Sequence, residues 1–376
     1  MVYVLKHFDT ELLKFSLEHE RLKGTVCKLQ WSNDAKKDLF PIGLTVSDEG
    51  ILSWLRSRTI PKNRGYVEAI LASMNLAEND IIGILDVCLG LSLNDCYWVV
   101  KEGFAGKFAD YNLYDHAFEK TLSLIAYVGY GSVKAKGFTS SPEFTTNGML
   151  RKGWRQIGGK TLLYKGGTEG ASNAGNEPFS EFYAAQIAAA MGLNHIDYTL
   201  ASWKKSVCSV CELFTSKKLA YVPIWRFGEF NNVVDVAEYL KSLGDKYYND
   251  FVDMMIFDAL IYNTDRHQGN FGLLVNTKTN KPVAFAPIFD NGLGLFPYAV
   301  KNDLENLAAY AKTRDAAFGV PFDEIAKAYI TDRQRKQLRK VLTFSFTKDK
   351  NYNLPAYRLK TLEKFIRARA GELIEM

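Results

Sequence analysis

The feature that most restricts the fold is an apolar stretch, Tyr247–Tyr262, with the sequence YYNDFVDMMIFDALIY. Its apolar residues cover nearly the whole circumference of a helix, and a helix of this kind is buried inside a domain. It ends at the polar segment Asn263–Asn270, which is followed by two short apolar runs, Phe271–Val275 and Pro282–Ala286. The pattern predicts a buried helix, a polar loop and then a hairpin that leads to Asp290.

The 376-residue chain is long enough for two or three domains, because single cores stop growing at about 250–300 residues. A run of turn-forming residues indicates a boundary near residue 140. We therefore predict three parts: an N-terminal region over 1–140, a second over 141–225 and a third over 226–376. The first region reads as α-rich with some strands, and helical spacing is present in Gly50–Arg56 and Tyr66–Asn75. Its role is not legible from the sequence.

The second part is predicted to follow the order strand, strand, helix, strand, strand. A glycine-containing turn separates the first two strands, and Gly192 is expected to end the helix. The corresponding ranges are Leu150–Ile157, Thr161–Lys165, Phe179–Met191, Asp197–Trp203 and Ser206–Phe214. The third part is mostly helical and begins with a helix over Val233–Ser242.

The composition is that of a folded globular protein, with 47% hydrophobic and 24% charged residues. The net charge of +5 is modest and the basic residues are spread along the chain, so direct binding to nucleic acid is not expected. Five cysteines, an odd number in a long chain, fit a reducing compartment. Because the sequence has neither a signal-peptide core nor a run of about 18 apolar residues, we expect a cytoplasmic protein without a membrane segment.

Three polar residues carry the candidate chemistry. Asp265 and Asn270 lie five residues apart after the buried helix, and Asp290 follows at the end of the hairpin. Phosphoryl transfer from ATP uses one carboxylate to position the acceptor hydroxyl, and it uses an amide oxygen and a second carboxylate to hold Mg²⁺. Taken singly, each residue would be an ordinary turn residue. Their grouping beside so apolar a helix favours a functional site.

The motif Asp-Arg-His-x-x-Asn, followed about twenty residues later by Asp-x-Gly, is similar to the catalytic and metal-binding motifs of the phosphatidylinositol-kinase-like superfamily. The arrangement from about Phe144 to the C-terminus resembles the HipA-like bacterial serine/threonine kinases. The segments SPEFTTNG, LYKGG and CELFT strengthen the resemblance. It implies an α+β, two-lobed protein-kinase-like fold, with a β-rich small lobe over 141–225 and a helical large lobe over 226–376, preceded by the α-rich N-terminal region.

The resemblance implies nucleotide-binding roles for four residues. Lys165 matches the lysine that contacts the ATP phosphates, and Glu181 matches its ion-pair partner. The alternative is that both are surface charges, which is the common fate of Lys and Glu. Glu212 and Phe214 fall where the family's hinge joins the lobes and binds adenine through backbone groups.

The resemblance also implies the catalytic and metal-binding roles. Asp265 matches the catalytic aspartate, and Asn270 and Asp290 match the Mg²⁺ ligands. His267 is predicted to orient the catalytic groups, because in HipA-like enzymes the aspartate suffices, with proton transfer by this histidine as the alternative. Arg266 is expected to pair with a nearby acid.

The sequence departs from the usual kinase pattern in two places. No G-x-G-x-x-G precedes Lys165, so the loop that covers the phosphates is either Thr145–Gly153 or Gly166–Asn176. No Ala-Pro-Glu motif follows Asp290, which argues against a eukaryotic-type protein kinase. HipA-like kinases as a family can autophosphorylate a serine in the first loop, and the possible counterparts here are Ser140, Ser141, Thr145 and Thr146.

The leading hypothesis is an ATP- and Mg²⁺-dependent kinase that phosphorylates a serine or threonine of another protein. A lipid kinase is the nearest enzymatic alternative, although the chain offers no obvious basic amphipathic membrane helix. The alternative from a different class is a non-catalytic ATP-binding regulator, such as the partner module of a toxin–antitoxin pair. An antitoxin-like protein partner is compatible with the resemblance. The sequence names neither the acceptor protein nor the oligomeric state.

Overall fold

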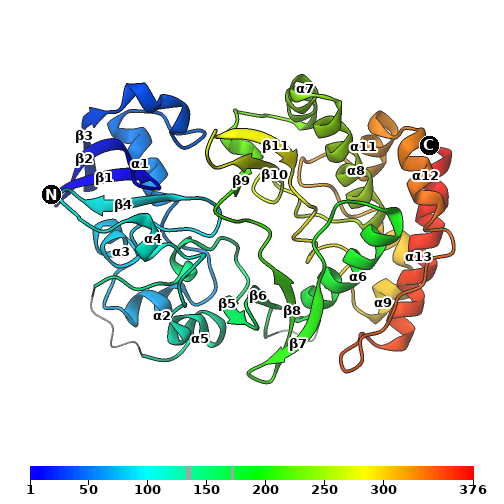
Figure 1. Ribbon diagram of the computed structural model, residues 1–376. Helices are drawn as coiled ribbons and strands as arrows, with labels where there is room; N and C mark the ends of the chain where they lie inside the picture. The colour runs from blue at the N-terminus through cyan, green and yellow to red at the C-terminus, as the bar shows by residue number, and fades with distance from the viewer. Residues whose placement is uncertain (133–136, 171–172) are drawn as a thin grey trace. The chain divides into compact units, whose positions relative to one another are not determined.

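The structure of the protein, a computed structural model, describes residues 1–132, 137–170 and 173–376. The chain forms two compact units (Figure 1). The first unit consists of Met1–Tyr164, Leu213–Val222 and Leu274–Val283. The second unit consists of Lys165–Glu212, Pro223–Leu273 and Ala284–Met376. Each unit is described by itself.

The first unit begins with a four-stranded antiparallel sheet in the order β3-β2-β1-β4. Its strands are β1 (Val2–His7), β2 (Thr10–Glu20), β3 (Gly24–Ser32) and β4 (Tyr97–Lys101). The central strand is β1, where Val4 is paired with Lys14 of β2 on one side and with Val100 of β4 on the other. Some strands were expected in this region, but the positions of β1, β2, β3 and β4 were not predicted.

Both faces of this sheet are covered. Because side chains alternate along a strand, Tyr3 and Leu5 pack on one face in a core that includes Trp54 of α1. Val4 points to the opposite face and packs in a second core with Trp98. Burial on both faces makes the strand apolar at consecutive positions, so β1 lacks the alternation that identifies a half-buried strand.

The helices of the first unit are short. They are η1 (Asp34–Leu39), α1 (Asp48–Arg56), α2 (Val67–Ala72), α3 (Ile81–Cys88), α4 (Phe108–Tyr111), α5 (Lys120–Val128) and the 3₁₀ turn η2 (Pro142–Thr145). The start of α1 is capped by the Ser47 hydroxyl, which accepts a hydrogen bond from the Gly50 amide at 3.0 Å. Residues of α2, α3 and α5 pack around Phe144 in a third apolar cluster.

The predicted hairpin after residue 150 is confirmed as β5 (Lys152–Ile157) and β6 (Lys160–Gly166). Gly158 and Gly159 form its turn with φ of +60° and +78°, values that favour glycine in a two-residue hairpin turn. The division between the two units falls inside β6, so that its last residues, from Lys165, belong to the second unit. The strands β9 (Leu219–Pro223), β10 (Gly272–Asn276) and β11 (Lys281–Phe285) form a three-stranded sheet in the order β11-β10-β9.

The second unit is dominated by helices packed around α8. Its strands, β7 (Thr199–Trp203) and β8 (Ser206–Glu212), form an antiparallel pair. Its helices are α6 (Glu177–Met191), η3 (Ile224–Arg226), α7 (Val233–Leu243), α8 (Asp245–Ile261), α9 (Lys301–Glu305), α10 (Leu307–Ala311), α11 (Phe322–Tyr329), α12 (Asp332–Arg339) and α13 (Ala356–Glu375). Residues from most of these helices line one continuous apolar core.

The helix α8 is buried as predicted. Every residue from Phe251 to Ile261 is buried, including two aspartates, Asp253 and Asp258. Buried carboxylates require compensating partners, and each has them: Asp253 accepts hydrogen bonds from Arg333, and Asp258 accepts them from Arg266. The second pair leads directly into the polar loop that follows α8.

The architecture is thus the predicted α+β fold, with strands and helices in both units. None of the five cysteines, all of which lie in the described ranges, forms a disulfide. Within the described ranges, no helix combines the length and the apolar character needed to cross a membrane. The limits predicted for the three parts, 1–140, 141–225 and 226–376, stay predictions.

Candidate active site

Lys165 lies at the centre of a group of charged residues in the second unit. It is the sixth residue of β6 and is 6% exposed. Its Nζ donates hydrogen bonds to Oε1 of Glu181 and, at 2.5 Å, to Oδ1 of Asp290. Burial opposes the charged form, but Asp290 and Glu181 outweigh burial and raise the pKa of Lys165 well above its ordinary value. The ammonium group is therefore charged and shared by two carboxylates.

Glu181 is presented by α6, which starts with Pro178 in its first turn and ends at Gly192 with φ of +80°. Its side chain is buried, and burial raises its pKa against the opposing charge of Lys165. Its second oxygen, Oε2, accepts a hydrogen bond from the Asn291 amide at 2.8 Å. Glu181 thereby holds both the lysine and the backbone that follows Asp290.

Asp290 has a left-handed backbone conformation with φ of +57°. Its amide donates to the hydroxyl of Tyr198 at 3.3 Å, and the Nζ of Lys165 lies 6.0 Å from the centre of the Tyr198 ring. Few non-glycine residues adopt this conformation, so the surrounding contacts must hold it in place. Tyr198, which precedes β7, supports both charged partners and was not predicted as a site residue.

The polar loop Asn263–Asn270 is folded tightly on itself. Tyr262 ends α8 in a left-handed conformation, and the Asn263 side chain then accepts a hydrogen bond from the Asp265 amide at 3.3 Å. The side-chain amide of Asn270 donates to the Asp265 carbonyl at 2.9 Å. Local side-chain contacts of this kind define the loop and bring Asp265 and Asn270 together.

Arg266 ties this loop to the neighbouring segments. It is 2% exposed and forms a two-pronged ion pair with Asp258 of α8, at 2.8 and 3.1 Å. Its remaining donors reach the Asn270 carbonyl at 3.0 Å, the Phe289 carbonyl and the Asn291 side-chain oxygen at 2.6 Å. The predicted pairing of Arg266 with an acid is confirmed. One guanidinium group joins α8, the loop and the segment around Asp290.

Asp265 is half-buried beside these groups. Burial raises the pKa of its carboxyl group, the charge of His267 opposes that rise, and the Asp290 carboxylate adds to it. His267 is exposed, and its Nδ1 accepts a hydrogen bond from the Gly269 amide at 3.0 Å. The imidazole is thus positioned by its own loop and acts on Asp265 through charge.

Comparison with known proteins identifies the family to which this group of residues belongs. The model of the HipA-like C-terminal domain family matches residues 141–343, which is more than half of the chain. The chain belongs to this family. The match includes the charged group around Lys165, the loop Asn263–Asn270 and Asp290. None of the comparisons supports the wider phosphatidylinositol-kinase-like superfamily, so that part of the resemblance is not retained.

Two relatives of this HipA-like chain are informative. It is 30% identical over 141 residues to the serine/threonine-protein kinase CtkA of Helicobacter pylori, an alignment that covers 33% of this chain and 42% of that protein. HipA of Shewanella oneidensis, solved with HipB and its operator DNA, matches with a TM-score of 0.51 at 12% identity and covers 98% of this chain and 97% of that one. At this identity the HipA match shows the fold alone. A structure of CtkA covers 60% of this chain and 91% of that chain at 18% identity, with a TM-score of 0.48.

The residues of this HipA-like site fit Mg²⁺ and ATP as ligands. The Asn270 amide group uses its nitrogen for Asp265, and its oxygen takes no hydrogen bond from the described residues. An amide oxygen and the carboxylate of Asp290 are hard oxygen ligands, and Mg²⁺ commonly takes one or two of them, completing its shell with water and phosphate. No cluster of three or more acidic, histidine or cysteine side chains able to hold a metal occurs in 1–132, 137–170 and 173–376.

The remaining predicted residues, Glu212 and Phe214, lie where the chain passes from the second unit to the first. Glu212 is exposed and ends β8, and Leu213 begins the next stretch of the first unit. The Phe214 ring contacts the Tyr221 ring edge-on, with 5.6 Å between centroids. Their proposed contact with adenine stays a prediction.

The candidate self-phosphorylation residues lie in the first unit. The Ser141 hydroxyl accepts a hydrogen bond from the Glu143 amide at 3.2 Å, and the Thr145 hydroxyl donates to the Leu91 carbonyl at 2.9 Å. The Thr146 hydroxyl donates to the Pro142 carbonyl at 2.7 Å. Ser140 is partly buried. Phosphorylation at Thr145 or Thr146 would remove the hydroxyl proton that each of these bonds uses.

Sequence reasoning missed Asp258 and Asn291 as supports of this site. Asp258 is a carboxylate within an otherwise apolar helix, and such a residue signals a buried partner. Asn291 gave no comparable signal, because its contact with Arg266 depends on the fold of two distant loops.

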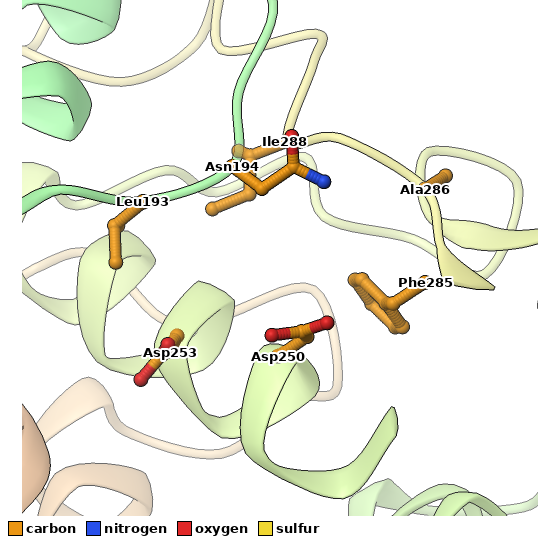
Figure 2. Close-up of a pocket in the computed structure, with 7 residues that line it drawn as sticks. All are labelled: Leu193, Asn194, Asp250, Asp253, Phe285, Ala286 and Ile288. Carbon is orange, nitrogen blue, oxygen red and sulfur yellow. The ribbon is translucent and has the colours of Figure 1, made fainter. Parts of the chain in front are cut away.

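The second unit also contains a small cavity that is lined by two acidic residues. Its volume is about 10 Å³, enough for one water molecule, and it is lined by Asp250 and Asp253 of α8 and by residues of the crossing segments, among them Asn194 and Ile288 (Figure 2). Asp253 accepts hydrogen bonds from Arg333 and Gln334. Asp253 is therefore held by hydrogen bonds from neighbouring side chains.

Proposed function

We propose that this HipA-like chain is an ATP- and Mg²⁺-dependent kinase that transfers the γ-phosphoryl group to a serine or threonine hydroxyl of another protein. The observation that supports it is the position of Lys165, buried between Glu181 and Asp290 at the end of β6. A strand lysine paired with a helix glutamate and placed next to the metal-binding aspartate is the arrangement that phosphoryl transfer requires in protein kinases.

Each residue then has a definite task. Lys165 holds the phosphates of ATP, and Glu181 keeps the lysine in place. Asn270 and Asp290 would hold the metal through their side-chain oxygens. Bound Mg²⁺ supplies neutralisation of charge on the phosphates. Because these groups are fixed by buried contacts before the substrate arrives, positioning and electrostatic stabilisation can supply most of the rate.

Asp265 would accept a hydrogen bond from the acceptor hydroxyl and take its proton as transfer proceeds. A base that titrates closer to neutral pH is more effective in this role, and burial moves the pKa of Asp265 in that direction. His267 would orient the groups around Asp265, and its positive charge would limit the rise in the pKa of Asp265. Backbone groups near Glu212 and Phe214 would bind adenine.

A protein partner is the second part of the proposal. HipA of Shewanella oneidensis, which shares the fold, was solved with HipB and operator DNA. A HipB-like protein is therefore the partner to seek, by co-purification of tagged chain from cells and by identification of proteins that bind it in a fixed ratio.

Incubation with labelled ATP and Mg²⁺ tests the activity. The wild type should transfer label to itself or to a protein in a lysate, Asp265→Asn should not, and Asp315→Asn, an exposed aspartate, should behave as the wild type. ATP binding without any transfer would instead indicate a non-catalytic regulator, and label in the lipid fraction alone would indicate a lipid kinase. Phosphoproteomics of cells expressing wild type or Asp290→Ala would then identify the acceptor.

A further inference from the structure

A second cavity in the second unit is lined by residues of the loop before α6 and of the starts of α9 and α13. Its volume is about 340 Å³, within the range of about 300–1,000 Å³ that is typical of small-ligand sites. The residues that matter for its chemistry are Asn173, Asn176, Lys301, Tyr357 and Arg358. None of these five residues belongs to the group around Lys165.

Arg358 is the unusual member of this cavity. It is 5% exposed, yet no carboxylate pairs with it among the residues that the structure describes. Its terminal nitrogens donate to the backbone carbonyls of Ala299 at 2.8 Å and Phe296 at 2.5 Å, and its Nε is buried without a hydrogen-bond partner. Buried cations are normally paired with an anion, because the carbonyl groups satisfy hydrogen bonds but do not cancel the charge.

The wall of the cavity is prebuilt. The Asn173 side chain donates to the Tyr298 carbonyl at 2.7 Å, and the Asn176 side chain donates to the Pro297 carbonyl at 2.8 Å. Together with Arg358, these amides engage every carbonyl from Phe296 to Ala299. A site held in this way loses little conformational entropy when it binds a ligand.

The charged side chains that line the cavity are positive. Lys301 is exposed and lines the cavity with Arg358, whereas no Asp or Glu among the described residues lines it. Two carboxylates on adjoining segments accept hydrogen bonds from neutral groups. Asp303 accepts from the Val300 amide at 2.9 Å, and Glu177 accepts from the Tyr298 hydroxyl at 2.7 Å. Two cations without a lining carboxylate match a ligand with two negative charges.

We propose that this cavity binds a phosphate dianion, free or esterified, between Lys301 and Arg358. Arg358 provides the buried charge, and Lys301 provides the second charge at the surface. The ammonium of Lys301 is the donor for the phosphate oxygens, and the guanidinium of Arg358, whose terminal nitrogens are held by backbone carbonyls, attracts the dianion through its charge. Asn173 and Asn176 belong to the loop Gly166–Asn176, one of the two candidates for covering the ATP phosphates, whereas Lys301 and Arg358 have no part in the proposed phosphoryl transfer.

Calorimetric titration of the full chain tests the proposal at low ionic strength and about pH 8, where a phosphate group is mostly a dianion. Inorganic phosphate and O-phosphoserine are the two probes, and acetate is the monoanion for comparison. Because phosphate could also bind at Lys165, each titration is repeated with the Lys165→Met variant, in which that site is removed. Binding in that background should weaken about fivefold in Lys301→Met and remain unchanged in Lys336→Met, an exposed lysine of α12 outside the cavity.

Arg358→Met should weaken binding more, about tenfold, because the buried positive charge is lost. If this variant does not fold, the Lys301→Met titration tests the proposal in its place. NMR spectra give a second readout, because phosphate should shift the side-chain amide signals of Asn173 and Asn176. Binding of O-phosphoserine alone would assign an esterified phosphate, and binding of both probes would admit the free ion. Binding that disappears in Lys165→Met, binding unaffected by Lys301→Met, or acetate binding as tight as phosphate would each overturn the proposal.

Discussion

The Nζ of Lys165 lies 2.5 Å from Oδ1 of Asp290, although the two residues are 125 positions apart in the chain. The same ammonium group also donates to Glu181. Two carboxylates therefore depend on one buried cation, and removal of the lysine leaves both without their counter-ion. The energetic coupling among these residues is measurable.

Replacing Lys165 with Met should lower the free energy of unfolding by about 3 kcal/mol, because Glu181 is then buried without its counter-ion. The double variant Lys165→Met, Glu181→Gln should lose less than the sum of the two single variants, with a coupling of about 0.5–3 kcal/mol. Urea unfolding of the four proteins gives this value. Lys336→Met is the control for removing an exposed lysine, and strictly additive losses would contradict the ion pair.

Arg266 should be a larger stability determinant than any exposed arginine. Arg266→Met leaves Asp258 buried and unpaired and frees the carbonyls of Asn270 and Phe289, so we expect a loss of about 3–5 kcal/mol. Arg339→Met, an exposed arginine of α12, should change stability by less than about 0.5 kcal/mol. Chemical unfolding of both variants makes the comparison. Similar midpoints for the two would show that the Arg266 contacts contribute little.

Asp265→Asn should lower phosphate transfer by about 10²–10⁴-fold while ATP affinity stays within a few-fold of the wild type. The amide keeps the shape of the side chain but does not take up the proton. Steady-state kinetics and nucleotide titration separate the two effects, with Asp315→Asn as the matched control. A parallel loss of ATP affinity would assign Asp265 to nucleotide binding rather than to acceptor activation.

The acid limb of the kcat/KM profile should have its midpoint above the ordinary aspartate pKa of 3.8, because burial raises the pKa of Asp265. Activity should rise with pH through that raised value, since the base acts as the carboxylate. The stability contribution has the opposite sign: the folded state binds the proton more strongly, so stability falls as pH rises from 3.8 through the raised pKa. His267→Gln should move the acid limb to higher pH, because the positive charge that opposes the shift is removed. An unmoved limb would exclude this electrostatic role of His267.

Several elements were predictable from local pattern. The burial of α8, the β5–β6 hairpin and the end of α6 at Gly192 each follow from apolar periodicity or from a glycine requirement within a few residues. The strand β1 was missed because burial on both of its faces removes the alternation that marks a strand, and a short run of apolar residues then fits several structures. The strand β2 was missed although Leu13, Phe15 and Leu17 alternate with polar residues.

The sequence by itself determined which chemistry was available: Asp265, Asn270 and Asp290 at kinase spacing, and the resemblance that pointed to Lys165 and Glu181. Only the tertiary structure decided that one ammonium group serves both Glu181 and Asp290, and that Asp258 is the acid that pairs with Arg266. Spacing along a chain encodes local geometry, whereas contacts between distant residues depend on how helices and loops pack. For that reason the candidate site could be named from the sequence, but the partners that hold it could not.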